Sequence, residues 1–170
     1  VGAIVINNAV GNPLLNDGPY FLSGHLELDK EFGGYGPSNK RYDNILRAKR
    51  ISPSLGITDT LNDISSNTVI GVVATDAKLS KAQCKALATV AHDGITRAVF
   101  PSHTTFDGDL MFAISTGEKQ LKENFNDILA INQAASLCVS RSIARGVYHA
   151  SNSKSDIFPS FKNKFKIKVS

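Results

Sequence analysis

Cysteine is scarce in this sequence, and long apolar runs are absent. The two cysteines, Cys84 and Cys138, are too few for a disulfide framework or a four-ligand zinc site. Both fall in helix-like segments, where we expect isolated cysteines to be small buried apolar side chains. The first apolar run, residues 1–6, ends at two asparagines, and no run reaches the roughly 18 apolar residues that a membrane-spanning helix needs. We therefore expect no membrane partner.

Most of the chain also lacks an excess of charge. The 170 residues carry a formal net charge of +4, and residues 152–170 alone hold five lysines against one aspartate. Nucleic-acid binding needs a basic face spread over a domain, usually with stacking aromatic side chains. Here the basic residues gather in one terminal tail, so we expect no nucleic-acid partner. We interpret the tail as a solvated strand or tail whose charges protect a sheet edge.

The overall composition is that of a globular protein. Apolar residues make up 42% and charged residues 20% of the chain, which suits one domain with a real core. The first residues, VGAIVI, have no signal-peptide features and begin as though already inside a strand. We therefore expect further sequence upstream of Val1.

The apolar pattern predicts alternating strands and helices after a loop-rich region. Short β-branched or apolar runs predict strands at residues 1–10, 68–75 and 110–115. Ser80 followed by Gln83 is a capping box, and the spacing predicts helices over about 80–98 and 121–148. Between the first two strands, turn residues recur with little periodicity, which is typical of a functional loop or a processing linker. This order predicts a mixed α/β domain with helices layered on a sheet.

Helical spacing also predicts which side chains face inward. On the first helix the predicted stripe is Cys84, Leu87, Ala88, Ala91 and Ile95. On the second helix it is Phe125, Leu129, Asn132, Ser136, Val139 and Ile143.

The junction between Asn67 and Thr68 places a hydroxyl residue at the head of an apolar strand, directly after a polar stretch. Composition alone favours an ordinary strand-starting threonine. The alternative hypothesis is an autoprocessing site, at which the Thr68 hydroxyl attacks the carbonyl of Asn67 and water completes the cut. The freed α-amine has a pKa of about 7.7–8.0 and can accept the hydroxyl proton, so one residue would supply both nucleophile and base.

Several segments together resemble one known family. They are VGAIVINNAVGNP (1–13), NTVIGVVATDA (67–77), AHDG (91–94) and HTTFDGD (103–109). The chain resembles the S58 peptidase family of N-terminal-nucleophile amide hydrolases, which includes L-aminopeptidase/D-esterases, β-peptidyl aminopeptidases and nylon-oligomer endohydrolases. Within the family it is most similar to the threonine-nucleophile, nylon-hydrolase-like branch.

The resemblance implies a fold, a processing event and partners. The fold would be an αββα sandwich of the N-terminal-nucleophile type. Cleavage at Asn67–Thr68 would divide one domain into residues 1–67, the C-terminal part of a large subunit with its processing linker, and residues 68–170, the small subunit. The substrate would be a small peptide or amide oligomer, with no metal or organic cofactor. The processed subunit pairs would form a homo-oligomer.

The resemblance also assigns the site residues. Thr68 would be the nucleophile, and the Asn8 amide would donate a hydrogen bond to the oxyanion. Asp107 and Asp109 would lie beside the nucleophile, where a carboxylate stabilises the protonated amine and orients the hydroxyl. Taken without the resemblance, Asn8 suits a strand-end turn, and the two aspartates suit an Asx turn or a solvated loop.

Two other arrangements around His103 are conceivable from the residues. Ser102, His103 and an aspartate contain the residue types of a hydrolytic triad, but triads are recognised by geometry. His103, Asp107 and Asp109 contain metal-ligand types, although their spacing in a loop does not define a site. We expect His92 to be a packed helix-face residue. The alternative functions are acyl transfer, as in ornithine acetyltransferases, and a non-catalytic oligomeric binding domain of the same fold.

Overall fold

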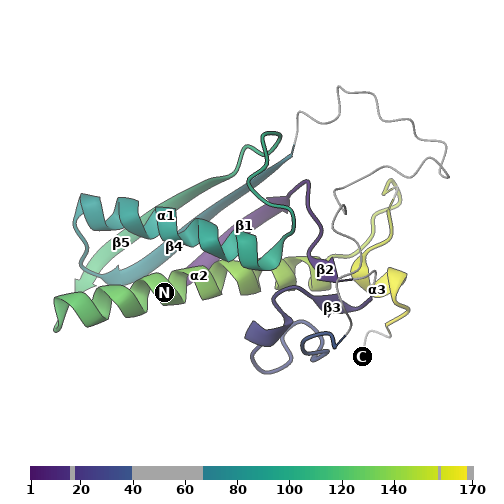
Figure 1. Cartoon of the computed structure of the whole chain (residues 1–170), viewed down its shortest axis with the longest axis horizontal. Coiled ribbons are helices and arrows are strands. Elements are labelled where there is room, and N and C mark those ends of the chain that lie inside the picture. Colours follow the sequence, from purple (N-terminus) through teal and green to yellow (C-terminus); the bar gives the residue numbers. More distant parts are fainter. Residues whose placement is uncertain (16–17, 40–66, 157, 168–170) are drawn as a thin grey trace.

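The computed structural model describes residues 1–15, 18–39, 67–156 and 158–167. Its centre is a sheet in the order β1-β4-β5 (Figure 1). The central strand β4 is antiparallel to β1 and parallel to β5. The strands are β1 (Gly2–Asn8), β4 (Thr68–Ala77) and β5 (Leu110–Lys119). All three were predicted from the sequence, and β5 extends further than the predicted 110–115.

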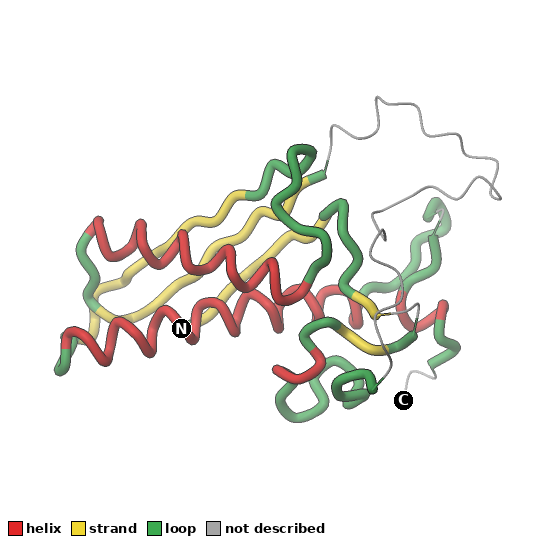
Figure 2. The backbone as a smooth tube through the Cα atoms, viewed as in Figure 1, coloured by secondary structure: helices red, strands yellow, loops and turns green. Residues whose placement is uncertain are grey.

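Two long helices, α1 (Lys81–Ala98) and α2 (Asn124–His149), pack against one face of this sheet (Figure 2). α1 connects β4 to β5, as a parallel strand pair requires. It begins at the predicted capping box, in which the Gln83 amide donates to Ser80 Oγ at 3.3 Å and the Ser80 amide donates to Gln83 Oε1 at 2.7 Å. In the described part of the chain, no helix combines the length and the apolar character needed to cross a membrane. The core between helices and sheet includes Val69, Val73, Leu87, Ile95, Met111, Val139 and Ile143.

The face of the sheet opposite the helices is apolar as well. Register aligns its side chains in rows across the three strands, among them Ile6–Ile70–Leu110 and Ile4–Val72–Phe112. Ile4 is 74% exposed and Phe112 is 55% exposed. A sheet that is apolar on both faces is typical of a layer inside a larger layered fold. The described residues therefore form an α+β layered arrangement, with one helix layer and one sheet layer of the kind that an αββα sandwich contains.

An aromatic cluster joins the segment after β1 to the C-terminal end of α2. Phe21 stacks on Phe161 with ring centroids 4.9 Å apart and meets Phe32 edge-on at 5.2 Å. All three rings are buried. The short elements of this region are β2 (Leu14–Leu15), β3 (Tyr20–Phe21), the 3-10 helix η1 (Gly24–Leu26) and α3 (Phe161–Lys164).

An ion pair fixes the same segment to α2. Arg141 Nη2 donates to Glu31 Oε2 at 3.0 Å, and Arg145 Nη1 lies 3.6 Å from the same oxygen. Burial raises the pKa of Glu31, but the hydrogen bonds from Arg141 and the Leu28 amide, with the charges of both arginines, lower it more. The pKa of Glu31 therefore lies below its usual value.

The described part of the C-terminal tail is mostly exposed, as predicted, but it forms no strand. Residues 161–164 form the helix α3, and Phe161 is only 5% exposed. The Ser160 hydroxyl accepts the Asn163 amide at 3.4 Å and caps this turn. Burial of the Phe161 ring thus favours a helical turn at a place where the lysine pattern indicated an extended chain. Most of the predicted processing linker, residues 40–66, lies outside the described residues.

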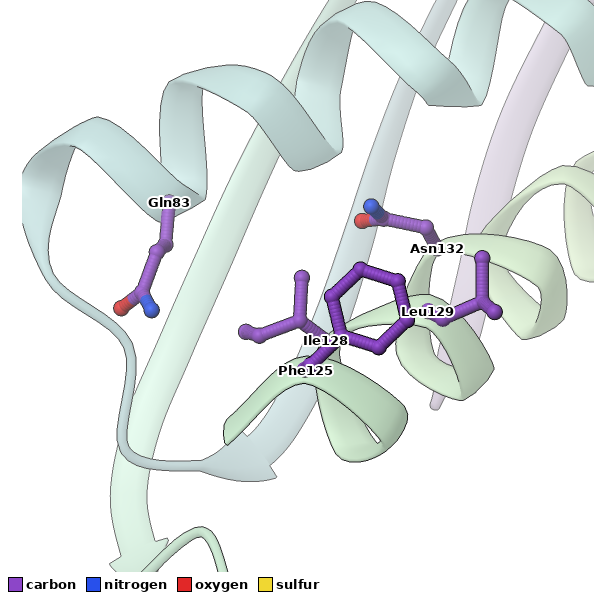
Figure 3. Close-up of a pocket in the computed structure, with 5 residues that line it drawn as sticks. All are labelled: Gln83, Phe125, Ile128, Leu129 and Asn132. Carbon is purple, nitrogen blue, oxygen red and sulfur yellow. The ribbon is translucent and has the colours of Figure 1, made fainter. Parts of the chain in front are cut away.

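The predicted helical stripes are correct in part. Leu87, Ala91 and Ile95 of α1 are buried, as are Ser136, Val139 and Ile143 of α2. By contrast, Phe125 is 79% exposed and Leu129 is 57% exposed. The first turns of α2 face the start of α1 across a groove lined by Gln83, Phe125, Ile128, Leu129 and Asn132 (Figure 3).

The two cysteines are half-buried rather than fully buried, which corrects the sequence expectation. Cys84 lies near the start of α1 and directly follows Gln83, which lines that groove. Cys138 Sγ lies 3.5 Å from the carbonyl oxygen of Val1 at the start of the chain. Both positions are at the margin of the core, so their side chains are only partly covered.

Candidate functional site

Thr68 and Asn8 lie opposite each other at one end of the sheet. Thr68 is the first residue of β4, and it pairs with Asn8, the last residue of β1. Directly opposed residues of an antiparallel pair project on the same face. The alternation of burial along both strands puts these two side chains on the face away from the helices. The structure thus brings together the predicted nucleophile and the predicted amide donor.

The carbonyl oxygen of Asn67 accepts two hydrogen bonds at this end of the sheet. Thr68 Oγ1 donates to it at 2.6 Å, and the Gly108 amide donates at 3.0 Å. Asn67 is buried, with 8% of its surface exposed, and Thr68 is half-buried. A hydroxyl therefore lies beside a carbonyl whose oxygen already has an amide donor, and such donors stabilise the negative charge that develops when a carbonyl is attacked.

Gly108 lies so close to Thr68 that a side chain there would press on the Thr68 hydroxyl. It follows the bridge between Asn67 and Asp107 and lies beside Thr68 across the sheet. A Cβ on Gly108 would come within 3.0 Å of Thr68 Oγ1, which is tighter than ordinary van der Waals contact. Close approach, rather than an unusual backbone conformation, explains the glycine here.

Asp107 ties the loop before β5 to the end of β1. Its Oδ2 accepts the Thr104 amide at 3.0 Å and the Thr104 hydroxyl at 2.7 Å. Its Oδ1 accepts the Val10 amide at 3.2 Å, two residues beyond Asn8. Asp107 therefore closes the turn from Thr104 to Asp107, in which its own amide donates to the Thr104 carbonyl at 3.0 Å, and it also fixes the position of the strand that carries Asn8. A direct part for Asp107 in the chemistry stays a prediction.

Asp109 holds the backbone on the other side of the junction. Its Oδ1 accepts the Val69 amide at 2.8 Å, and its Oδ2 lies 2.7 Å from His103 Nδ1. The Asp109 side chain is only 5% exposed. Asp107 and Asp109 thus both lie near Thr68 in space, and both accept hydrogen bonds from backbone amides around it. Their individual roles in catalysis stay predictions.

The triad suggested by adjacent Ser102 and His103 does not form. Ser102 Oγ donates to Thr96 Oγ1 at 3.3 Å, whereas the His103 ring turns toward Asp109. In the ranges that the structure describes, His, Cys, Asp and Glu side chains form no group of three or more suited to a metal ion. The loop therefore supports neither the triad nor the metal site that its residue types allowed.

His92 packs on α1 close to the same loop, as expected for a helix-face residue. Its ring lies 5.1 Å from that of His103, between centroids. Burial lowers the pKa of His92, and the charge of His103 lowers it further, against smaller opposing effects of Asp109 and Asp93. A neutral His92 is therefore favoured beside His103.

Two features of this site were missed from the sequence. The first is the pairing of His103 with Asp109, and the second is the contact of Gly108 with both the Asn67 carbonyl and the Thr68 hydroxyl. The pairing of His103 with Asp109 could have been predicted, because a histidine and an aspartate stand at the two ends of one short loop. The second could be inferred only from the strand register, because it depends on which residue of the loop lies beside Thr68.

The groove of Figure 3 lies at the other end of the sheet. Its residue Gln83 is in the first turn of α1, which follows the C-terminal end of β4, whereas Thr68 is at the N-terminal end of that strand. This groove is therefore not part of the arrangement around Thr68.

Comparison with known proteins agrees with the resemblance. The model of peptidase family S58 matches residues 1–156. An uncharacterized aminopeptidase of Mycobacterium tuberculosis is 34% identical over 160 residues, which cover 88% of this chain and 44% of the relative. An uncharacterized aminopeptidase of Mycobacterium leprae is 39% identical over 117 residues, 69% of this chain and 29% of the relative.

A 6-aminohexanoate-oligomer endohydrolase of Paenarthrobacter ureafaciens is 33% identical over 57 residues, 34% of this chain and 16% of the relative. The chain spans less than half the length of these relatives. Because the family model matches all of the chain except its last 14 residues, the chain belongs to peptidase family S58.

Proposed function

We propose that this chain carries the nucleophile of a self-processing N-terminal-nucleophile amide hydrolase. The observation that carries the proposal is the position of Thr68 Oγ1, 2.6 Å from the carbonyl oxygen of Asn67 at the head of the central strand. Cleavage between Asn67 and Thr68 would give pieces of 67 and 103 residues. The larger piece would begin with Thr68.

The cut would proceed through an ester. Thr68 Oγ attacks the carbonyl carbon of Asn67, the C–N bond breaks, and the hydroxyl proton passes to the leaving nitrogen, which becomes an amine. Water then adds its hydroxyl to the acyl carbon and returns a proton to Oγ, leaving a carboxylic acid on Asn67. During the attack, the Gly108 amide stabilises the negative charge on the carbonyl oxygen, to which it already donates at 3.0 Å.

The freed residue would then act on external amides. The α-amine of Thr68, with a pKa of about 7.7–8.0 for an ordinary α-amino group, accepts the proton of Oγ as Oγ attacks the substrate carbonyl. The substrate amine leaves with that proton, and water hydrolyses the acyl-enzyme. The Asn8 side chain, opposite Thr68 on the same face, donates to the oxyanion, while Asp107 and Asp109 hold the surrounding backbone. These steps use only protein groups and water.

Family membership and the names of the relatives support an amide substrate. The relatives are called aminopeptidases and 6-aminohexanoate-oligomer endohydrolases, which is consistent with a small peptide or amide oligomer as substrate here. Residues 1–67 and 68–170 would be parts of the large and small subunits of one domain, and processed pairs would assemble into a homo-oligomer.

The test is the mass of the chain under denaturing conditions. The complete polypeptide that contains this chain should split during incubation and yield a fragment that begins at Thr68. Thr68→Ala should abolish the split, because it removes the nucleophilic oxygen. Thr105→Ala is the matched control, since Thr105 is exposed in the loop before β5, and it should split like the wild type.

Two results would contradict the proposal. A Thr68→Ala chain that still splits at the same bond would exclude self-catalysis. A wild-type chain that stays intact, without a new Thr68 N-terminus, would favour the non-catalytic binding domain. If the chain splits but an added amine outcompetes water for the acyl group, the activity is acyl transfer.

A further inference from the structure

His103 occupies an unusual backbone conformation beside the site. It lies in the loop between α1 and β5, with φ of 54°. This left-handed region is uncommon for a residue with a Cβ, so surrounding contacts must hold it there. The contacts of the imidazole ring show what this conformation achieves.

Both ring nitrogens of His103 face hydrogen-bond acceptors. Nδ1 lies 2.7 Å from Asp109 Oδ2, and Nε2 lies 3.3 Å from the carbonyl oxygen of His92. A backbone carbonyl and an ionised carboxylate can only accept, and a neutral imidazole has only one N–H to donate. The contact with the carboxylate is the shorter of the two, so Nδ1 is the nitrogen that donates to Asp109.

Asp109 transmits this contact to the nucleophile. Its other oxygen accepts the Val69 amide at 2.8 Å, and that amide belongs to the same peptide plane as the carbonyl of Thr68. The carboxylate is almost fully buried, so the hydrogen-bonding partners of its two oxygens offset part of the cost of burying it. A continuous set of contacts therefore runs from the backbone of α1, through His103 and Asp109, to the backbone of Thr68.

We propose that His103 is a positioning residue whose imidazole holds the Asp109 carboxylate in place, and that Asp109 in turn fixes the backbone of the nucleophile Thr68. The inference rests on the proposed function, because it takes Thr68 as the nucleophile. His103 acts through Asp109 and does not accept the hydroxyl proton.

The charged and titratable groups around His103 are consistent with this role. Asp109 faces it from the start of β5, and His92 faces it from α1, with Asp93 acting on His92. The pKa of His92 is lowered by burial and by the charge of His103. The Asp109 carboxylate is paired with the ring of His103.

The test compares His103→Gln and His103→Ala with the wild type in the complete polypeptide. The readouts are the rate of cleavage at Asn67–Thr68, from mass spectra of denatured samples, and the melting temperature. We expect His103→Ala to slow cleavage by about 10- to 100-fold, since a misplaced reacting group loses rate on this scale. His103→Gln should recover part of the rate, because its amide can donate to Asp109 without carrying charge.

Rescue by the conservative variant separates positioning from a merely structural role. His103→Gln keeps a donor toward Asp109, so it should be cut faster than His103→Ala at an equal melting temperature. His25→Gln is the matched control, because His25 is exposed in η1, and it should be cut at the wild-type rate.

The outcomes distinguish this inference from the proposed function. If the wild type is cut and Thr68→Ala is not, a His103→Ala chain that is cut as fast as the wild type overturns the role of His103 and leaves the proposed function standing. A His103→Gln chain that is cut no faster than a slow His103→Ala chain does the same. If the wild type is not cut at all, both proposals fail. If His103→Ala does not fold, His103→Gln decides alone, and a rate equal to that of the wild type overturns the role of His103.

Discussion

Replacing Gly108 with alanine tests whether the space around the Thr68 hydroxyl controls the chemistry. The new Cβ would lie 3.0 Å from Thr68 Oγ1 and 3.9 Å from the Asn67 carbonyl oxygen, whereas unstrained contacts are about 3.5 Å or longer. The hydroxyl must therefore shift by about half an ångström or rotate away from the carbonyl. Because a misplacement of about 1 Å can cost about 100-fold in rate, we expect cleavage at Asn67–Thr68 to slow about tenfold.

Folding should not suffer from this substitution. The backbone at Gly108 is not in the left-handed region, so alanine fits without strain there. We expect the free energy of unfolding to stay the same or to rise by up to about 1 kcal/mol, because alanine restricts the unfolded chain. Slower cleavage with unchanged stability would mark an effect on the site itself.

The assay is a time course of denatured mass spectra on Gly108→Ala and on Gly146→Ala. Gly146 lies in α2, and a Cβ there would meet nothing within 4 Å. Gly146→Ala should stabilise the helix by up to about 1 kcal/mol and leave cleavage unchanged. A Gly108→Ala chain that is cut as fast as the wild type would refute the importance of this close approach.

Two further predictions concern stability. Ile95→Ala should lower the free energy of unfolding by about 2–5 kcal/mol in urea titrations, because Ile95 is fully buried between helices and sheet. Ile95→Val should lower it by only about 0.5–1.5 kcal/mol. Equal losses for the two variants would contradict a tightly packed site. Glu31→Gln should be less stable than the wild type at neutral pH and should lose less stability in acid. The folded-state pKa of Glu31 is lowered by its arginines, so its contribution is present above the unfolded-state pKa and disappears as pH falls through the folded-state pKa. Urea titrations at several pH values check this, and parallel curves for the two proteins would refute it.

Local signals in the sequence were enough for most of the fold. The capping box at Ser80 and Gln83 and the β-branched run after Thr68 depend on neighbouring residues, so they predicted α1 and β4 correctly. Phe125 and Leu129 follow the same helical spacing as the core residues but line an open groove beside the start of α1, and spacing alone cannot tell a covered face from an open one. The C-terminal helix was missed because one buried ring, Phe161, outweighs its lysine neighbours.

The sequence named residues that lie close together in the structure, but it did not predict all the contacts among them, and their catalytic roles stay predictions. The pairing of Asn8 with Thr68 and the proximity of both aspartates agree with the positions that the resemblance implied. The contact between His103 and Asp109 depends on a left-handed residue in an irregular loop. Such a conformation follows from tertiary contacts, which no periodicity in the sequence records.

The antiparallel pairing of β1 with β4 has a consequence for any scission at Asn67. All seven residue pairs of this ladder join a residue before that bond to one after it, and so does the stacking of Phe21 on Phe161. The two products would therefore remain a single nicked particle that migrates as one species in native gel filtration. The bond between Asn67 and Thr68 would be broken, but the strands of the two products would stay hydrogen-bonded to each other. Only denaturation would therefore separate them.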